Sequence, residues 1–208
     1  SYPFVPPIKG HDRENTFVYR TLDDLDAIRE CAKTAKTGTV VGGGLLGLEA
    51  ANGLVQNGMH VTVIHHNKIL LNRQLDKTAA QLLQQELESR GIHFKLSSSA
   101  HEILDNGNGH VGSVSFLDGS KLDCDLFVMA VGVRPNKELA ESSGIYCENG
   151  IVVSDTLQTF DPSIYAVGEC IQHRGQTFGL VAPLFDQAKV CANHLSGHGV
   201  AEYKTLPT

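Results

Sequence analysis

The feature that most constrains the fold is a glycine-rich turn at residues 42–47, which follows a short apolar strand expected at Thr39–Val41 and precedes a helix. A Gly-x-Gly-x-x-Gly turn in this position suits the pyrophosphate of a dinucleotide, because the helix N-terminus offers free N–H groups and positive partial charge. Gly42 would permit the tight turn, Gly44 the close approach of the phosphates, and Gly47 the packing of helix on strand. An ordinary glycine-rich loop is the alternative. The turn residues predicted to bind the cofactor are Gly42, Gly43, Gly44, Leu45, Leu46 and Gly47.

Helices and strands alternate after this turn. Apolar residues at helical spacing predict a helix that starts at the turn and stops near Asn57–Gly58. The elements expected after it are a strand at His60–His65, a second helix at Leu75–Arg90 and a strand at Ile92–Lys95. This order favours a Rossmann-like α/β fold with a parallel sheet and right-handed crossovers.

An antiparallel three-stranded insertion interrupts the alternation. Asn-Gly and Asp-Gly turns separate short strands expected at Ala100–Leu104, Val111–Phe116 and Lys121–Cys124. The continuous apolar run Leu126–Val131 is expected to return to the parallel sheet as a buried strand.

Less regular segments flank this core. Prolines deny the N-terminus a helix, and a helix capped by Thr21 is expected to reach about Ala35. The C-terminal elements expected are a helix at Lys137–Ser143, strands at Ile151–Val153 and Ile164–Val167, and a helix at Leu184–Leu195.

The residue that reads the adenosine ribose should end the second strand. An acid there favours NAD and a nearby arginine favours NADP. His65 stands at that position, followed by His66, so neither rule is met. Lys68 and Arg73 could meet a 2′-phosphate or could be solvated surface charges, and the choice between NAD and NADP stays open.

Charge and cysteine usage exclude other classes. The net charge of −6 without a basic cluster argues against nucleic acid and anionic membrane as partners, and no apolar run could span a bilayer. Five widely spaced cysteines with no Cys-x-x-Cys pair make a disulfide framework, an active-site dithiol and a cysteine-only zinc site improbable, and no metal ligands are predicted. A reduced, cytoplasmic setting is the simplest interpretation.

Three stretches in the right order resemble the FAD-dependent pyridine nucleotide-disulfide oxidoreductases. They are Val40–Ala51 around the glycine turn, Val128–Asn136 with its Gly-x-x-Pro-Asn connection, and Thr159–Glu169, which is similar to the second flavin motif. Further stretches, including Asn72–Asp76 and Gly168–Gly175, resemble the large subunits of NAD(P)H-dependent nitrite reductases.

The resemblance implies roles for specific residues. Glu49 would lie near the nicotinamide, or is simply an acid stabilised by the helix dipole. Val131 and Gly132 would pass near the nicotinamide riboside, although Gly132 could be a plain turn glycine. Gly168 and Glu169 would hold the ribityl chain of FAD. No catalytic side chain is nominated.

The resemblance also implies that the chain is an internal piece of a longer enzyme, since only one dinucleotide turn is found. The expected domains are a flavin-domain remnant with a linker helix at 1–36, an NAD(P)H-binding domain at 37–154, and a second flavin-domain remnant at 155–208. Such a piece would bind NAD(H) weakly, hold little FAD and lack nitrite reductase activity.

In the implied parent, a hydride passes from NAD(P)H to FAD, and electrons then reach sirohaem and iron–sulfur centres in other domains, which reduce nitrite to ammonium in nitrate assimilation. Its partners would be downstream redox domains or a small subunit, and exposed apolar surface could pair two copies as a homodimer. An NADH-dependent rubredoxin or ferredoxin reductase and a non-catalytic nicotinamide-nucleotide sensor are the alternatives.

Overall fold

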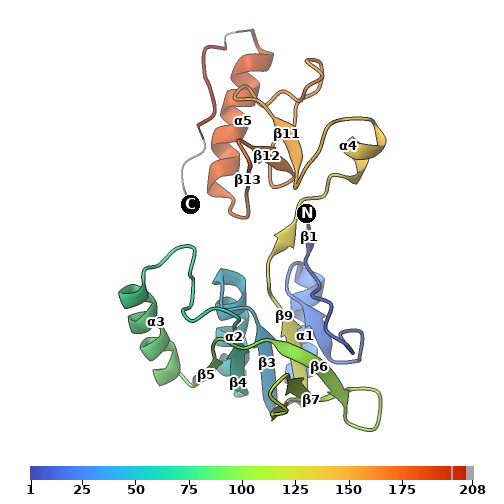
Figure 1. Cartoon of the computed structure of the whole chain (residues 1–208), viewed down its shortest axis with the longest axis vertical. Helices are drawn as coiled ribbons and strands as arrows, with labels where there is room; N and C mark the ends of the chain where they lie inside the picture. Colours follow the sequence, from blue (N-terminus) through green and yellow to red (C-terminus); the bar gives the residue numbers. More distant parts are fainter. Residues whose placement is uncertain (198, 205–208) are drawn as a thin grey trace. The chain divides into compact units, whose positions relative to one another are not determined.

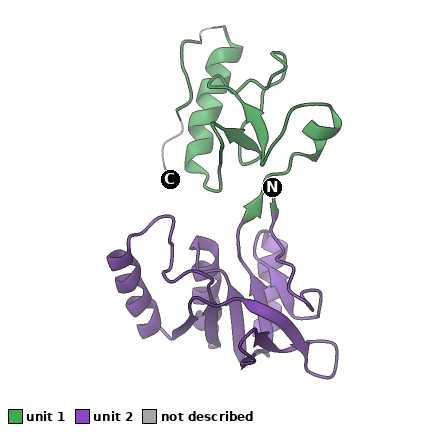
Figure 2. Cartoon of the chain, viewed as in Figure 1, with its two compact units in different colours: residues 1–2, 133–208 green, residues 3–132 purple. Residues whose placement is uncertain are grey.

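The computed structural model describes residues 1–197 and 199–204, which form two compact units (Figure 2). One unit comprises residues 3–132, and the other comprises residues 1–2 and 133–208. The units are defined by contacts within the folded chain. The predicted division into flavin-domain segments at 1–36 and 155–208 and a nicotinamide domain at 37–154 is not the same as this division into units, and it stays a prediction.

A five-stranded parallel sheet forms the centre of the first unit (Figure 1). Its strands, in spatial order, are β2 (Thr16–Val18), β9 (Leu126–Met129), β3 (Thr37–Val41), β4 (His60–Ile64) and β5 (Ile92–Lys95). Every neighbouring pair is parallel. The predicted parallel sheet is confirmed, including the return of the strand after the insertion. The edge strand β2 was not predicted.

The two faces of this sheet are covered differently. Along β9, Leu126 and Val128 pack into a core with α1 (Leu22–Ala32) and α2 (Leu45–Gln56), whereas Phe127 and Met129 pack on the opposite side. That opposite core is closed by the antiparallel sheet of β6 (Ala100–Asp105), β7 (Val111–Phe116) and β8 (Lys121–Asp123). The unit therefore has helices on one face of its parallel sheet and a second sheet on the other, and the predicted antiparallel insertion is confirmed.

Two of the helices in this unit begin with a side-chain cap. Thr21 and Asp24 form a capping box at the start of α1, and the Asp76 carboxylate accepts a 2.8 Å hydrogen bond from the Ala79 N–H at the start of α3 (Lys77–Ser89). The helix α2, in contrast, begins at Gly44 with no side-chain cap. Its first N–H groups are therefore left for another partner.

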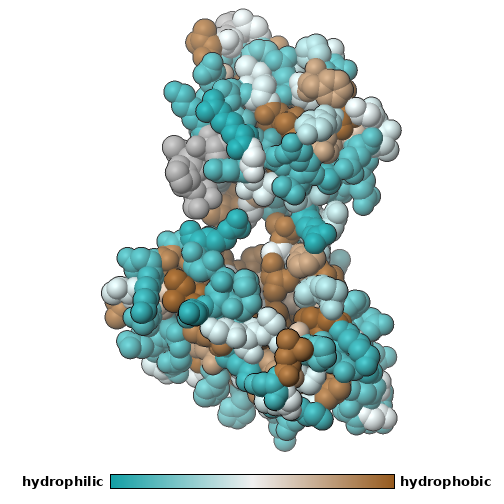
Figure 3. Space-filling view, viewed as in Figure 1, coloured by the Kyte–Doolittle hydropathy of each residue, from teal (hydrophilic) through white to brown (hydrophobic). Residues whose placement is uncertain are grey.

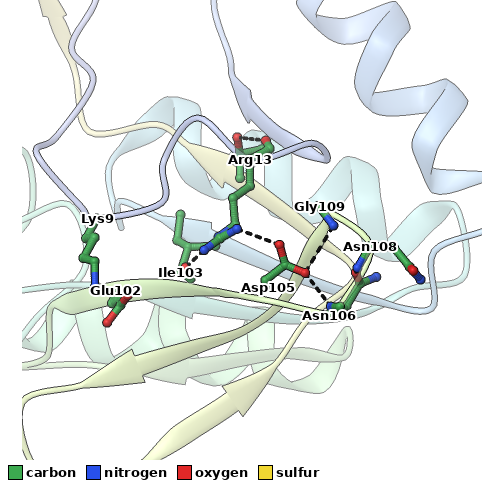
Figure 4. Close-up of polar contacts among 10 residues, drawn as sticks. Lys9, Arg13, Glu102, Ile103, Asp105, Asn106, Asn108 and Gly109 are labelled. Carbon is green, nitrogen blue, oxygen red and sulfur yellow. Dashed lines mark hydrogen bonds and ion pairs between the residues drawn. The ribbon is translucent and has the colours of Figure 1, made fainter.

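The N-terminal segment is fixed to β6 by paired charges (Figure 4). Lys9 lies 2.7 Å from Glu102, and Arg13 donates from Nε to the Ile103 carbonyl at 3.1 Å and from Nη1 to Asp105 at 2.7 Å. These contacts join residues about ninety positions apart in the sequence. They hold the chain that runs into β2 beside the antiparallel sheet.

The second unit is a small α/β structure. Its three-stranded sheet contains β11 (Ile151–Val153), β12 (Ile171–His173) and β13 (Gln176–Thr177), and Leu157 and Phe178 lie in the core with residues of α5 (Ala182–Leu195). The remaining elements are β1 (Tyr2–Pro3), which pairs with β10 (Val133–Arg134), and the short helix α4 (Glu138–Ser142).

The predicted buried strand at Ile164–Val167 is wrong. Only Tyr165 makes an isolated bridge, with Gln158, and Ile164 and Val167 are each 39% exposed. The segment folds back on the preceding turn, where the Ala166 N–H donates to the Leu157 carbonyl, and the place beside β11 is taken by β12. An apolar, β-branched run favours an extended backbone, but it does not provide a neighbouring strand.

Hydrophilic residues cover most of the visible face of each unit (Figure 3). No described helix is both long enough and apolar enough to cross a lipid bilayer.

Candidate functional site

The glycine turn between β3 and α2 is shaped by close backbone packing. Gly42 has a φ of +120°, and a Cβ there would lie 2.2 Å from the carbonyl oxygen of Ala130 in the neighbouring strand connection. A Cβ on Gly47 would lie 1.8 Å from the Gly42 carbonyl oxygen. These two positions require glycine because β3, β9 and α2 meet there.

Gly44 differs from them, because a Cβ at this position would meet nothing within 4 Å. The residue is the N-cap of α2, and the first turn of that helix carries no acid. The start of α2 therefore presents open space, unpaired N–H groups and positive partial charge. An anionic group such as a pyrophosphate fits this cradle.

His65 supports the turn from the end of β4. Its ring is 6% exposed, and Nδ1 accepts a 3.1 Å hydrogen bond from the Gly43 N–H. A Cβ on Gly43 would lie 2.7 Å from Cγ of this ring and 2.9 Å from Leu70. Burial, followed by the neighbouring charge of His66, lowers the pKa of His65 below its usual value. The neutral ring therefore carries its proton on Nε2.

A cavity of about 240 Å³ opens above the turn, entirely within the first unit. Its lining contains two histidines and an arginine but no carboxylate. The predicted site residues that it brings together are Gly42, Gly43, Gly44, Leu45, Leu46, His65, Arg73, Val131 and Gly132.

Four predicted site residues lie outside this lining. Gly47 is buried beneath the turn, and Glu49 is exposed farther along α2. Glu49 adds, after burial, to the raised pKa of Tyr19. Gly168 and Glu169 belong to the second unit, where the Gly168 N–H donates to the buried Gln187 side chain at 2.8 Å. Their roles stay predictions.

Sequence reasoning missed three residues of the lining. Ala130 follows β9, and the expected placement of that strand in the sheet was a signal that could have found it. His66 was weighed beside His65 but not chosen, and Gln74 lay within the Asn72–Asp76 stretch of the family resemblance without being nominated. A second cavity of about 380 Å³ shares Gly42 with the first and is lined partly by Phe4 and other residues of the N-terminal segment.

The cysteines lie outside this cavity and are all free. Burial raises the pKa of each thiol, that of Cys124 to about 11. Neutral thiols are poor nucleophiles. Among the residues that the structure describes, no cluster of three or more His, Cys, Asp or Glu side chains could hold a metal ion.

A glycine turn at the carboxyl edge of a parallel sheet, above an uncapped helix, defines an α/β protein with a Rossmann-like nucleotide-binding architecture. The family model for pyridine nucleotide-disulphide oxidoreductases matches residues 1–192. The chain belongs to this family.

Proteins of similar sequence include nitrite reductases from two bacteria. The chain is 48% identical to a nitrite reductase [NAD(P)H] of Bacillus subtilis, over 98% of the chain and 25% of that protein, and 44% identical to the nitrite reductase (NADH) large subunit of Escherichia coli, over 95% and 24%. It therefore spans about a quarter of the length of these relatives.

The fold also matches solved structures. A ferredoxin reductase from Rhodopseudomonas palustris superposes with a TM-score of 0.91 and 29% identity, covering 99% of this chain and 52% of that one. The oxidoreductase fold expected from the resemblance is confirmed.

Proposed function

We propose that this chain binds the electron donor, a nicotinamide dinucleotide, in a flavoprotein reductase that feeds the reduction of nitrite to ammonium. One observation carries the binding step: the acid-free cavity lies directly above the uncapped start of α2. The identity to nitrite reductases, at 48% and 44%, supports the choice of acceptor.

Gly44 and the first N–H groups of α2 would bind the pyrophosphate, and Val131 and Gly132 would flank the nicotinamide half. The chain's own contribution is position and electrostatics. A bound NAD(P)H would supply a hydride to FAD, which groups that include Gly168 and Glu169 would hold in the complete protein. Sirohaem and an iron–sulfur cluster would belong to other domains, and the protein would work in the cytoplasm with downstream redox domains or a small subunit.

Calorimetric titration of the chain with NADH and with NADPH tests the binding step. We expect a saturable signal with at least one of them, and a Gly44→Val variant of unchanged thermal stability should lose it. Absence of a signal with both nucleotides would contradict the proposal.

The acceptor is tested on the complete protein. Oxidation of the nucleotide should depend on nitrite and yield ammonium. A rubredoxin-NAD(+) reductase of Acinetobacter baylyi is 33% identical over 96% of this chain and 52% of that protein, which makes transfer to a small iron–sulfur protein the second candidate. Rapid reduction of rubredoxin or ferredoxin without any response to nitrite would favour it.

A further inference from the structure

We infer that Asn108 is a site of spontaneous modification: its side chain cyclises onto the backbone nitrogen of Gly109 and is hydrolysed to aspartate or isoaspartate. The loop between β6 and β7 thereby acquires a new carboxylate as the protein ages. Asn108 lines a cavity of about 550 Å³ that shares no residue with the two cavities beside the glycine turn. The inference is therefore independent of the proposed function.

The reaction needs only water and a suitable local geometry. Asparagine is among the chemically labile residues of proteins. The backbone nitrogen of the following residue gives up its proton and attacks the side-chain amide carbon, and the amide nitrogen takes up a proton and leaves as ammonia. Water then opens the succinimide ring at either carbonyl, and no electrons are transferred. A following glycine favours the attack, because it has no Cβ and its backbone is the least restricted.

The sequence contains five Asn-Gly pairs, so the motif alone does not select a site. They begin at Asn52, Asn57, Asn106, Asn108 and Asn149. Asn52 lies inside α2, where helical hydrogen bonds fix the peptide that follows it. Asn57 ends the same helix, and its Nδ2 donates to the Gly53 carbonyl at 2.8 Å. The Gly58 N–H is also engaged, by the Val55 carbonyl at 2.8 Å, so neither pair in this region is free to cyclise.

Two further pairs are held by their surroundings. The peptide after Asn149 is tightly packed, since a Cβ on Gly150 would lie 2.7 Å from a backbone atom of β12. Asn106 is anchored twice: its Oδ1 accepts the Asn108 N–H at 2.9 Å, and its own N–H donates to the His110 carbonyl at 3.1 Å. These contacts fix the side-chain carbonyl of Asn106, which is therefore not free to meet the nitrogen of the next residue.

The pair at Asn108 has the freedom that the others lack. Asn108 is exposed, and its side chain makes no hydrogen bond with any residue that the structure describes. It stands between two glycines with positive φ, 100° at Gly107 and 88° at Gly109. The Gly109 N–H donates to the Asp105 carboxylate at 3.2 Å, and Figure 4 shows this carboxylate between Arg13 and Gly109. The attacking nitrogen thus faces a group that can accept its proton.

The product changes both the charge and the backbone of the loop. Asn108 lines its cavity together with Lys36, so the reaction adds a negative charge to that cavity. Isoaspartate also lengthens the backbone just before Gly109, whose carbonyl accepts the Glu14 N–H at 3.3 Å. That hydrogen bond helps to fix the N-terminal segment beside the antiparallel sheet. The isoaspartyl form should therefore unfold at a lower temperature than the native chain.

The experiment is incubation of the native chain, Asn108→Gln and Asn106→Gln at neutral and at alkaline pH, followed by peptide mass spectrometry that locates each modified asparagine. Asn106→Gln is the matched control, because it removes the neighbouring Asn-Gly pair from the same loop. We expect modification of the native chain to concentrate at Asn108 and to be faster at alkaline pH, since the attacking nitrogen must lose its proton. Asn108→Gln should lose nearly all of it, and Asn106→Gln should keep it.

The same incubation in urea separates the effect of the fold from that of the sequence. We expect all five Asn-Gly pairs of the unfolded chain to react at similar rates. Modification of the folded chain that is spread evenly over the five pairs, or concentrated at another asparagine, would overturn the inference. A folded chain that stays unmodified while the unfolded chain reacts would overturn it too. Unchanged circular dichroism of both variants excludes misfolding as the cause of any difference.

Discussion

The Nδ1 atom of His65 accepts a 3.1 Å hydrogen bond from the N–H of Gly43 and so ties the end of β4 to the glycine turn. The two residues are 22 positions apart. A Cβ on Gly43 would lie 2.7 Å from Cγ of the same ring, so this side chain fixes the direction of the Gly43 N–H and also leaves no room for a side chain at that position. The shape of the turn thus depends on a residue outside the glycine motif.

Replacing His65 by alanine should lower the free energy of unfolding by about 1–3 kcal/mol, because the buried Gly43 N–H loses its acceptor. His65→Asn should retain much of that stability, since its Oδ1 can take the place of Nδ1. Urea unfolding of the two variants and the native chain measures the difference. Equal stability of all three would show that the hydrogen bond contributes nothing.

The same pair predicts a pH dependence. Burial lowers the pKa of folded His65 below its ordinary value of 6.5, so the unfolded chain takes up this proton more readily. The contribution of His65 to stability is therefore complete above about pH 6.5 and is lost as the pH falls through the folded pKa. Urea unfolding from pH 8 to pH 5 should show this loss in the native chain and less of it in His65→Asn. Parallel pH curves for both proteins would contradict the assignment.

The sequence was a good guide to the central sheet, because each element there carries its own periodicity. The glycine turn and the helix capped by Thr21 are local patterns and were predicted correctly. The edge strand β2 has only three residues and depends on its pairing with β9, so no local signal marks it. The positive φ angles of Arg174 (48°) and Gly175 (80°) form the turn between β12 and β13, which sequence reasoning overlooked.

The cavity could be foreseen only in part. The turn and strand ends follow from the motif and the parallel order, but Gln74 and the N-terminal Phe4 reach their cavities through tertiary packing. The sequence also placed His65 where a ribose-reading acid is expected. It could not reveal that the ring is buried and bound to Gly43, because that depends on the side-chain conformation.

Substitutions at two glycines of the turn should have different effects, one on folding and the other on binding. Gly47→Ala should lower the free energy of unfolding by about 1–3 kcal/mol or more, because its Cβ would overlap the Gly42 carbonyl oxygen 1.8 Å away. Gly44→Ala should leave stability close to native, since nothing lies within 4 Å of its Cβ and its φ is −90°. If the pyrophosphate lies there, this variant should bind NADH more weakly. Thermal unfolding and calorimetry give the two readouts, and native binding by Gly44→Ala would argue against the proposed position of the pyrophosphate.

In the second unit, the Asp155 carboxylate contacts two basic side chains at the end of β12. Its carboxylate lies 2.8 Å from His173 Nε2 and 2.5 Å from Arg174 Nη2, and the His173 side chain is fully buried. These partners, Arg174 first and then His173, lower the pKa of Asp155 to about 2. Asp155→Asn should destabilise the chain, because a neutral amide cannot replace the charged contact with Arg174 or leave His173 as well paired.

The stability that this cluster contributes should be lost at a lower pH than the stability that His65 contributes. A carboxylate with a depressed folded pKa contributes stability that is complete above its ordinary value of 3.8 and is lost as the pH falls toward about 2. The native chain should therefore lose stability between these values more steeply than Asp155→Asn. Arg174→Gln, which removes the exposed partner and keeps the buried one, should lie between the two. Acid unfolding followed by circular dichroism checks the order, and coincident curves for the native chain and Asp155→Asn would show that the cluster does not stabilise the fold.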